Sequence, residues 1–348
     1  MAQRPHHLVR VLLAQPEVQV RWVEPAPSRL PRPSDLLYPG SRSGSKGAGG
    51  NVQVFSPPRF PAEPLSDWLV DTLCSSLIQT ILGQGKTDLL IVGKPSRLAC
   101  RLAELLRAQN PQMNVLWDLM DDMPAFHTGR AASRMRRQAS ALWWLADAVW
   151  ASSSALFNQA RDELAARGRA TPLQLVRNGI DSRRYLHPES REERGRPKSR
   201  AGGLTLGYVG SIAPWLDWSA LATLARVRPN DMIELIGPVH TRIPPLPPNI
   251  RILPAVAHEA VPQVLQRLDW GLIPFVENQL TRAVDPIKYY EYRAAGLPVL
   301  STAFGDMRLR SEPDGVWSLE AALARPSLLD AVGRDEFAVD PLWVEAQD

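Results

Sequence analysis

Cysteine and long apolar runs are scarce in this sequence of 348 residues. Its two cysteines, Cys74 and Cys100, cannot form a disulfide framework or a zinc site built from thiolates, which indicates a reducing compartment. No apolar run reaches the roughly 18 residues that a transmembrane helix requires, since the nearest, 141–157, contains Asp147 and three serines. The N-terminal residues have no small-residue cleavage site, which disfavours a secretory signal. We therefore expect a cytoplasmic protein.

Lysine is also scarce, and arginine supplies most of the positive charge. Residues 1–185 carry 23 Lys and Arg against 15 Asp and Glu, whereas residues 186–348 carry 17 against 21. This asymmetry indicates that the first half meets an anionic partner, for example by peripheral contact with the inner membrane leaflet. An arginine-rich overall composition explains the same excess without a partner. Nucleic acid is not expected, because no groove pattern of basic and aromatic residues accompanies the charge.

Short apolar runs alternate with longer stretches of helical periodicity along the chain. This alternation is typical of an α/β protein with parallel sheets, and the 45% of hydrophobic residues exclude a wholly disordered chain. The expected strands are 18–24, 52–55, 88–92, 114–117, 148–151, 173–176, 204–209, 232–236, 249–253, 271–275 and 298–301. The expected helices are 65–82, 97–109, 130–147, 154–167, 218–227, 259–268 and 286–295.

One segment interrupts this alternation. Residues 188–203 are highly charged and have no apolar periodicity, which is typical of a linker. We therefore expect an N-terminal domain over 1–186, a linker over 187–203 and a C-terminal domain over 204–348. Both domains are expected to be doubly wound and Rossmann-like, and ligands of such sheets bind at the carboxyl ends of the strands. Two such domains facing each other would form a cleft between them.

The most informative stretch of the sequence is 285–300. Asp285 suits a helix N-cap, Pro286 suits the first helical position and Gly296 suits the position after the C-cap, so a short helix is expected between them. Lys288 and Glu291, three residues apart, share one face of this helix near its N-terminus. A helix N-terminus with a nearby cation suits a pyrophosphate, and a carboxylate one turn later can accept the hydroxyls of a ribose. The alternative is an exposed Lys–Glu pair without a ligand.

The same stretch resembles the donor-binding segment of GT-B-fold glycosyltransferases. Three more blocks match this family in the expected order, namely 206–212, 234–238 and 177–181. Two blocks of the first half, 3–8 and 117–122, resemble bacterial surface-polysaccharide enzymes of the teichuronic acid type. The resemblance spans about residues 3–310. It implies two Rossmann-like domains and a nucleotide-sugar donor, linked to UDP or GDP, with no further cofactor and no metal site.

The resemblance also assigns roles to residues of the second half. It implies that Glu291 binds the ribose hydroxyls and Lys288 the diphosphate, with Arg282 as a second cation. Gly210 and Ser211 would allow the first loop of the donor domain to approach the phosphates or the sugar closely.

The resemblance also implies that the backbone near His258 reads the nucleobase. Two residues of the first half are candidate general bases. His7 lies where the first helix is expected to face the cleft, and its imidazole titrates near neutrality. Asp122, with Asp118 and Asp121 beside it, follows an expected strand and could orient an acceptor or take its proton. The alternatives are a surface histidine at a helix start, a cap for a following turn at Asp122, and a divalent-ion site at the acidic cluster.

The sequence departs from the family pattern at two places. Many retaining members carry a Glu at the position of Ala283, so their mechanism cannot simply be transferred; Asp285 and Glu277 are the candidate substitutes. The family also begins with a buried strand and a glycine loop before its first helix. Either the start of this sequence has been assigned too late, or the N-terminal domain lacks this first strand, which is what we expect.

The sequence as a whole predicts a glycosyltransferase of the cell envelope. It would move a sugar from a nucleotide-sugar donor to a surface glycan or a lipid-linked acceptor. One alternative is a degenerate GT-B scaffold without catalysis, which the two departures favour. The other is a nucleotide-sugar epimerase of the same fold, which would need no acceptor.

Overall fold

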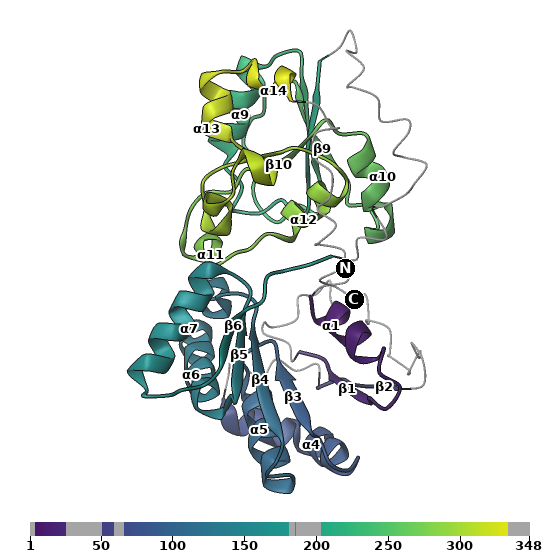
Figure 1. Ribbon diagram of the computed structural model, residues 1–348, viewed down its shortest axis with the longest axis vertical. Coiled ribbons are helices and arrows are strands. Elements are labelled where there is room, and N and C mark those ends of the chain that lie inside the picture. The colour runs from purple at the N-terminus through teal and green to yellow at the C-terminus, as the bar shows by residue number, and fades with distance from the viewer. Residues whose placement is uncertain (1–3, 26–50, 59–65, 181–184, 186–202, 333–348) are drawn as a thin grey trace. The chain divides into compact units, whose positions relative to one another are not determined.

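The computed structural model describes residues 4–25, 51–58, 66–180, 185 and 203–332 (Figure 1). The chain divides into two compact units, with the division between Arg177 and Asn178. Residues 187–202 of the expected linker lie outside the described residues. No helix within the described ranges is long and apolar enough to cross a membrane.

The N-terminal unit contains a four-stranded parallel sheet and a separate two-stranded parallel sheet. In the larger sheet the strands lie in chain order, β3 (Leu89–Val92), β4 (Asn114–Leu119), β5 (Ala148–Ala151) and β6 (Leu173–Leu175). The smaller sheet pairs β1 (Val20–Val23) with β2 (Val52–Phe55). The helices of the unit are α1 (Arg4–Leu12), α3 (Asp67–Leu73), α4 (Ser75–Leu82), α5 (Arg97–Gln109), η1 (Met123–Phe126), α6 (Gly129–Leu145) and α7 (Ser154–Ala166).

Serine side chains define where several of these helices begin. Ser66, Ser96 and Ser153 each accept a hydrogen bond from the backbone N–H three residues later, at the starts of α3, α5 and α7. The single helix expected over 65–82 is wrong, because the chain breaks into α3 and α4 at Cys74. Beside this break Ser75 Oγ donates to the Thr72 carbonyl at 2.7 Å, a local bond that competes with helix continuation.

Arg21 connects the two sheets of the N-terminal unit. Its guanidinium donates to the carbonyl of Gln84 at 2.7 Å and to Thr87 Oγ1 at 2.9 Å, on the segment that leads into β3. Within the described residues, β1 pairs with β2 and β3 pairs with β4. The expectation that a first strand is absent from this domain stays a prediction.

The C-terminal unit is a six-stranded, wholly parallel sheet with the strand order β12-β11-β10-β7-β8-β9. Its strands are β7 (Thr205–Val209), β8 (Met232–Ile236), β9 (Ile250–Leu253), β10 (Trp270–Ile273), β11 (Val299–Ser301) and β12 (Val316–Ser318). The chain winds outward from β7 to β9 and then returns to β10, which pairs with β7 on the other side. The switch point of this doubly wound sheet therefore lies between β7 and β10, where such sheets bind ligands.

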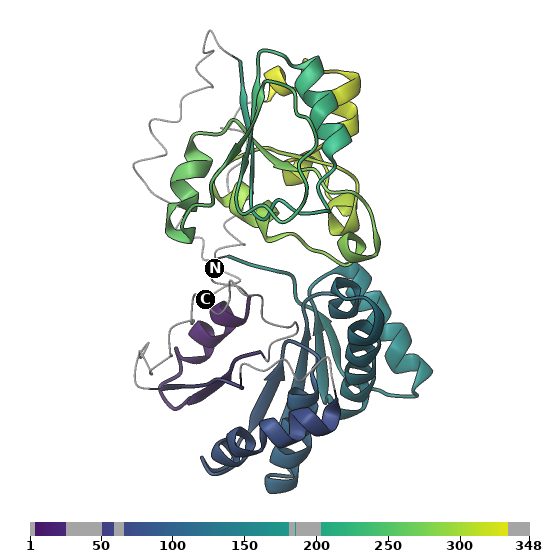
Figure 2. The same ribbon diagram turned by 180° about the vertical axis from the view of Figure 1, so that it is seen from behind.

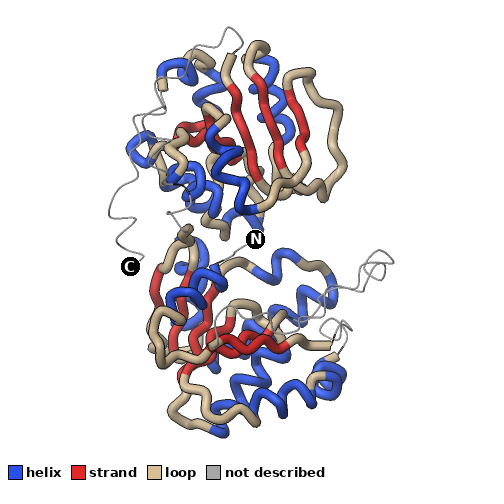
Figure 3. Tube along the Cα trace, turned by 90° about the vertical axis from the view of Figure 1, so that its right-hand side faces the viewer, coloured by secondary structure: helices blue, strands red, loops and turns tan. Residues whose placement is uncertain are grey.

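Helices cover both faces of this sheet (Figures 1 and 2). They are α9 (Trp218–Val227), η3 (His258–Ala260), α10 (Val261–Gln266), α11 (Gln279–Arg282), α12 (Ile287–Ala294), η4 (Gly305–Leu309), η5 (Glu312–Asp314), α13 (Leu319–Ala324) and α14 (Leu328–Ala331). α9, α13 and α14 lie together on one side and α10 on the other, and Figure 3 shows the strands between helical layers. Burial on both faces explains why strands such as β10 are continuous apolar runs.

One contact fixes α12 against the switch point. A Cβ at Gly271 of β10 would lie 2.3 Å from Cδ2 of Tyr292, so only glycine lets this ring pack on the strand. The Tyr292 hydroxyl accepts a hydrogen bond from the Val209 backbone N–H at 3.0 Å, at the end of β7. The helix that carries Lys288 and Glu291 is thus held beside the carboxyl end of β7.

Candidate active site

Gly210 and Lys288 lie together at the switch point. Gly210 follows β7 with a φ of 152°, a conformation that favours glycine. A Cβ at this position would lie 2.3 Å from Cε and 2.5 Å from Nζ of Lys288. The Lys288 ammonium lies 5.3 Å from the centre of the Tyr208 ring, and the Tyr208 hydroxyl donates to the carbonyl of Ser211 at 2.8 Å. The end of β7, its glycine loop and the Lys288 cation therefore form one surface.

Glu291 is buried beside this surface, with 8% of the residue exposed. Its Oε1 accepts a hydrogen bond from the hydroxyl of Tyr185 at 3.2 Å. Burial raises the pKa of the Glu291 carboxyl, while the charges of Lys288 and His258 and the Tyr185 hydrogen bond oppose that shift. The structure therefore brings together Lys288, Glu291 and His258, and it adds Tyr185, which the sequence reasoning missed.

His258 lies beside Glu291 and Lys288, and one nitrogen of its imidazole has no hydrogen-bond partner among the described residues. It is the first residue of η3, a few residues beyond β9, and its Nδ1 is buried with no hydrogen-bond partner among the described residues. Leaving a buried polar atom without a partner costs about 1–3 kcal/mol, and such an atom is explained when a ligand supplies the missing partner. The sequence predicted only that the backbone here reads a base, and the imidazole gives a second polar group at the same position.

The start of α12 differs from the sequence prediction. Pro286, and not Asp285, is the N-cap residue, and it makes no side-chain cap hydrogen bond. Gly296 does lie beyond the end of the helix with a φ of 72°, as expected. The carboxylate of Asp285 is used elsewhere: it accepts hydrogen bonds from the Tyr290 hydroxyl at 2.6 Å and from Arg310 at 2.6 Å.

Asp285 and Arg310 form a buried ion pair that anchors the entry to α12. Their side chains are 0% and 9% exposed. The Asp285 carboxylate also accepts from the backbone N–H of Asn178 at 3.1 Å, and the Asn178 side chain donates to the Asp285 carbonyl at 2.6 Å. The Arg310 guanidinium lies 3.9 Å from the centre of the Tyr289 ring. Asp285 is therefore occupied by a structural network, which argues against it as the substitute for the glutamate missing at position 283.

Arg282 and Glu277 form an ion pair near α11. Arg282 Nε lies 3.1 Å from Glu277 Oε1, and Arg308 Nη2 lies 2.6 Å from Glu277 Oε2. The hydrogen bond from Arg308, followed by that from Arg282, lowers the pKa of Glu277. Glu277 is thus held between two cations, and the role of Arg282 at a diphosphate stays a prediction. Ala283 is buried as the C-cap of α11.

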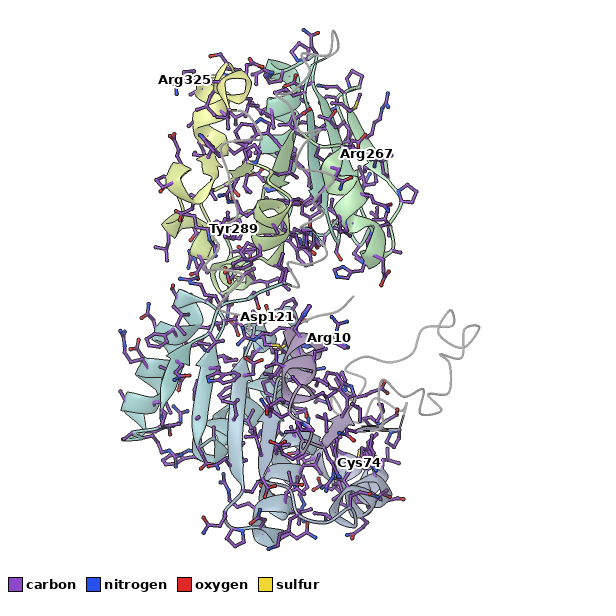
Figure 4. All side chains as sticks on the ribbon, turned by 45° about the vertical axis from the view of Figure 1, so that its right-hand side comes forward. Arg10, Cys74, Asp121, Arg267, Tyr289 and Arg325 are labelled. Atoms are coloured by element: carbon purple, nitrogen blue, oxygen red, sulfur yellow. The ribbon has the colours of Figure 1, made fainter. Side chains whose placement is uncertain are left out.

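The candidate general bases lie in the N-terminal unit. His7 belongs to α1 and is half-buried. Asp122 occupies the N-cap position of η1, but its side chain makes no cap hydrogen bond, so the alternative of a capping role is not supported there. Asp118 is buried at 1% exposure on β4, and Asp121 follows that strand (Figure 4). The catalytic roles of His7 and Asp122 stay predictions.

Asp121 has a perturbed carboxyl. Burial, followed by the charges of Asp118 and Asp122, raises its pKa to about 6 from the ordinary value of 3.8. A carboxyl with such a pKa is half ionised near pH 6 and exchanges its proton close to the physiological range, which suits proton transfer.

We expect Asp121→Asn to stabilise the protein at pH 7.5 and to have little effect at pH 4. Between pH 3.8 and about 6 the folded state keeps a proton that the unfolded state releases, so stability falls as pH rises. Removing this carboxyl should recover about 2–3 kcal/mol at pH 7.5. Thermal unfolding at both pH values measures the difference, with the exposed Asp162→Asn of α7 as control. An equal effect of Asp121→Asn at both pH values would contradict the shifted pKa.

The comparisons with known proteins agree with this architecture. No family model matches the chain. A segment of 164 residues, 45% of the chain, is 30% identical to a protein of Bacillus subtilis (strain 168) named "Putative teichuronic acid biosynthesis glycosyltransferase TuaH". The matched segment spans 40% of that relative's length.

Solved structures match over most of the chain. HepE from Anabaena, crystallised with UDP and glucose, superposes with a TM-score of 0.58 at 15% identity, over 89% of this chain and 91% of HepE. Sucrose-phosphate synthase from Thermosynechococcus elongatus superposes with a TM-score of 0.62 at 14% identity, over 99% of this chain and 86% of that enzyme. TarM from S. aureus superposes with a TM-score of 0.54 at 9% identity, over 80% of this chain and 55% of TarM. The chain therefore has the GT-B fold, and the resemblance to GT-B glycosyltransferases that its sequence indicated is confirmed.

Proposed function

We propose that this protein is a glycosyltransferase that moves a sugar from a nucleotide-sugar donor to a cell-envelope glycan or a lipid-linked acceptor. The observation that carries the proposal is the group at the switch point of the C-terminal sheet. There Gly210, Lys288 and Glu291 come together although Gly210 lies far from the other two in the sequence. This group fits the two polar parts that nucleotide sugars share, a diphosphate and a ribose.

Each member of the group has a chemical use in transfer. The glycine loop lets the backbone approach the diphosphate closely, and the Lys288 ammonium neutralises charge that develops on the leaving diphosphate. The carboxylate of Glu291 accepts hydrogen bonds from the ribose hydroxyls, and these charge-assisted bonds are stronger than neutral ones. The orphaned Nδ1 of His258 offers one more polar contact. Because these groups are fixed by the fold, they need little reorganisation when the donor binds.

The relatives support the donor class and the acceptor class separately. HepE was crystallised with UDP-glucose as well as with UDP and glucose. TarM was crystallised with UDP and α-GlcNAc-glycerol. The related segment of TuaH belongs to a protein named for teichuronic acid biosynthesis. We therefore propose that this chain also uses a UDP-linked donor and an acceptor of the cell envelope. As part of the same proposal, the arginine-rich N-terminal unit makes a peripheral contact with an anionic membrane.

Calorimetric titration of the purified chain with UDP and GDP, with and without Mg²⁺, tests the donor site. We expect micromolar binding of one of the two nucleotides. Incubation with the matching UDP- or GDP-sugars, with and without glycan acceptors, then separates transfer from epimerisation, because only transfer needs an acceptor. Binding without turnover for any donor and acceptor would favour the non-catalytic scaffold, the alternative that Ala283 in place of a glutamate favours. Binding of neither nucleotide by the folded protein would refute the donor site.

A further inference from the structure

The structure assigns Tyr185 as a positioning residue for Glu291, an inference that rests on the proposed function and deepens it. Tyr185 is 106 residues from Glu291 in the sequence, and its hydroxyl lies 3.2 Å from Oε1 of that carboxylate. Both residues are buried, Tyr185 at 5% and Glu291 at 8% exposure. The contact lies within the C-terminal unit.

The hydroxyl has a defined effect on the carboxylate. A tyrosine O–H donates to an ionised carboxylate and so favours its charged form, the form that accepts hydrogen bonds from a ribose. Among the influences on the pKa of Glu291, the hydrogen bond from Tyr185 lowers it, against burial, which raises it. Without that hydroxyl, burial would leave Glu291 protonated over a wider pH range and less able to bind the donor.

The hydroxyl also orients the carboxylate. Oε1 is engaged by Tyr185, whereas Oε2 has no hydrogen-bond partner among the described residues. A carboxylate held by one oxygen presents the other in a fixed direction, so less side-chain freedom is lost when a ligand binds. We infer that Tyr185 holds Oε2 towards the ligand and keeps the carboxylate ionised.

Tyr185→Phe tests this role because it removes only the hydroxyl. We measure the UDP affinity of the full chain by calorimetry between pH 5 and pH 8.5 for the wild type and the variant. UDP itself titrates identically in both experiments, so the difference between the two profiles belongs to the protein. We expect the loss of affinity on acidification to begin about half to one pH unit higher in Tyr185→Phe, with at most a threefold change at pH 8.5.

Tyr289→Phe is the matched control. It removes another hydroxyl of the same unit, which donates to the carbonyl of Asp314 at 3.2 Å, away from Glu291. We expect its pH profile to coincide with the wild type. Profiles of Tyr185→Phe and wild type that coincide would overturn the positioning role, and so would a higher UDP affinity of Tyr185→Phe at every pH, which would mean that the hydroxyl competes with the ligand.

A second measurement keeps the inference separate from the proposed function. Carbon-13 NMR of the Glu291 carboxyl, assigned with Glu291→Gln, follows its titration without any nucleotide. We expect its pKa to be higher in Tyr185→Phe than in the wild type. An unchanged pKa overturns the inference even if UDP binds. Failure of the wild type to bind either UDP or GDP overturns the donor site, whatever the titration shows.

Discussion

Arg310→Ala is expected to lower the free energy of unfolding of the C-terminal unit by about 3–5 kcal/mol. The variant removes the partner of Asp285, whose side chain is 0% exposed. Asp285 would keep its hydrogen bonds from the Tyr290 hydroxyl and the Asn178 N–H but would hold a buried charge without a cation. The contact of the guanidinium with the Tyr289 ring is lost as well. The entry to α12, and with it the position of Lys288, depends on this pair.

Arg308→Ala is the control for this prediction. Arg308 lies two residues from Arg310 and pairs with Glu277, but these side chains are 53% and 31% exposed, so the expected loss is at most about 1 kcal/mol. Two compact units can unfold separately, so chemical denaturation alone does not report on the C-terminal unit. Hydrogen exchange of residues 285–296 should therefore be measured as well. The double variant Asp285→Asn/Arg310→Leu should recover part of the stability, since it leaves no unpaired buried charge. Equal losses for Arg310→Ala and Arg308→Ala would contradict the anchoring role.

Glu291→Ala is expected to weaken UDP binding by about 30- to 150-fold, which corresponds to about 2–3 kcal/mol. The reason is the loss of a buried, ionised acceptor for the ribose hydroxyls, beside Lys288 and His258. Calorimetry at pH 7.5 measures the change. If Glu291→Ala binds UDP as the wild type does, the assignment of the ribose site is wrong.

Glu291→Gln separates binding from folding. Burial raises the pKa of Glu291, so its ionisation disfavours the folded state as pH rises, and a neutral amide removes that penalty. The amide oxygen still accepts the hydrogen bond from Tyr185. The variant should therefore be at least as stable as the wild type at pH 7.5 while it binds UDP more weakly. Glu234→Gln on β8 serves as the control and should change neither property.

Helix boundaries show which parts of the fold local sequence rules could predict. The ranges of α5 and α9 agree with the predicted 97–109 and 218–227, because a side-chain cap begins each helix and the apolar spacing is regular. The short strand β12, of three residues, was not predicted, since such a run carries little periodicity and is defined by its pairing with β11. The prediction that Asp285 is an N-cap is wrong for a related reason. Its carboxylate binds the distant residues Arg310 and Asn178, and these partners compete with the local cap.

The residues of the candidate site also fall into two groups, those that the sequence indicates and those that only the structure identifies. Gly210, Lys288 and Glu291 were found in the sequence because they belong to blocks that resemble a known family. Tyr185 was missed, because nothing in its sequence neighbourhood indicates that its hydroxyl contacts a residue 106 positions away. The pKa of about 6 at Asp121 follows from its burial and from the charges of Asp118 and Asp122, and burial is set by the folded structure.

The sequence by itself determined the alternation of strands and helices, the parallel sheets and the helix that carries Lys288 and Glu291, because these depend on local periodicity and on short punctuated blocks. The tertiary structure decided the rest. It placed the glycine loop of β7 against Lys288, buried Glu291 beneath the hydroxyl of Tyr185 and used Asp285 as an anchor in place of a cap. These features depend on which distant side chains share a desolvated space, and desolvation sets both the charge state and the partners of a polar group.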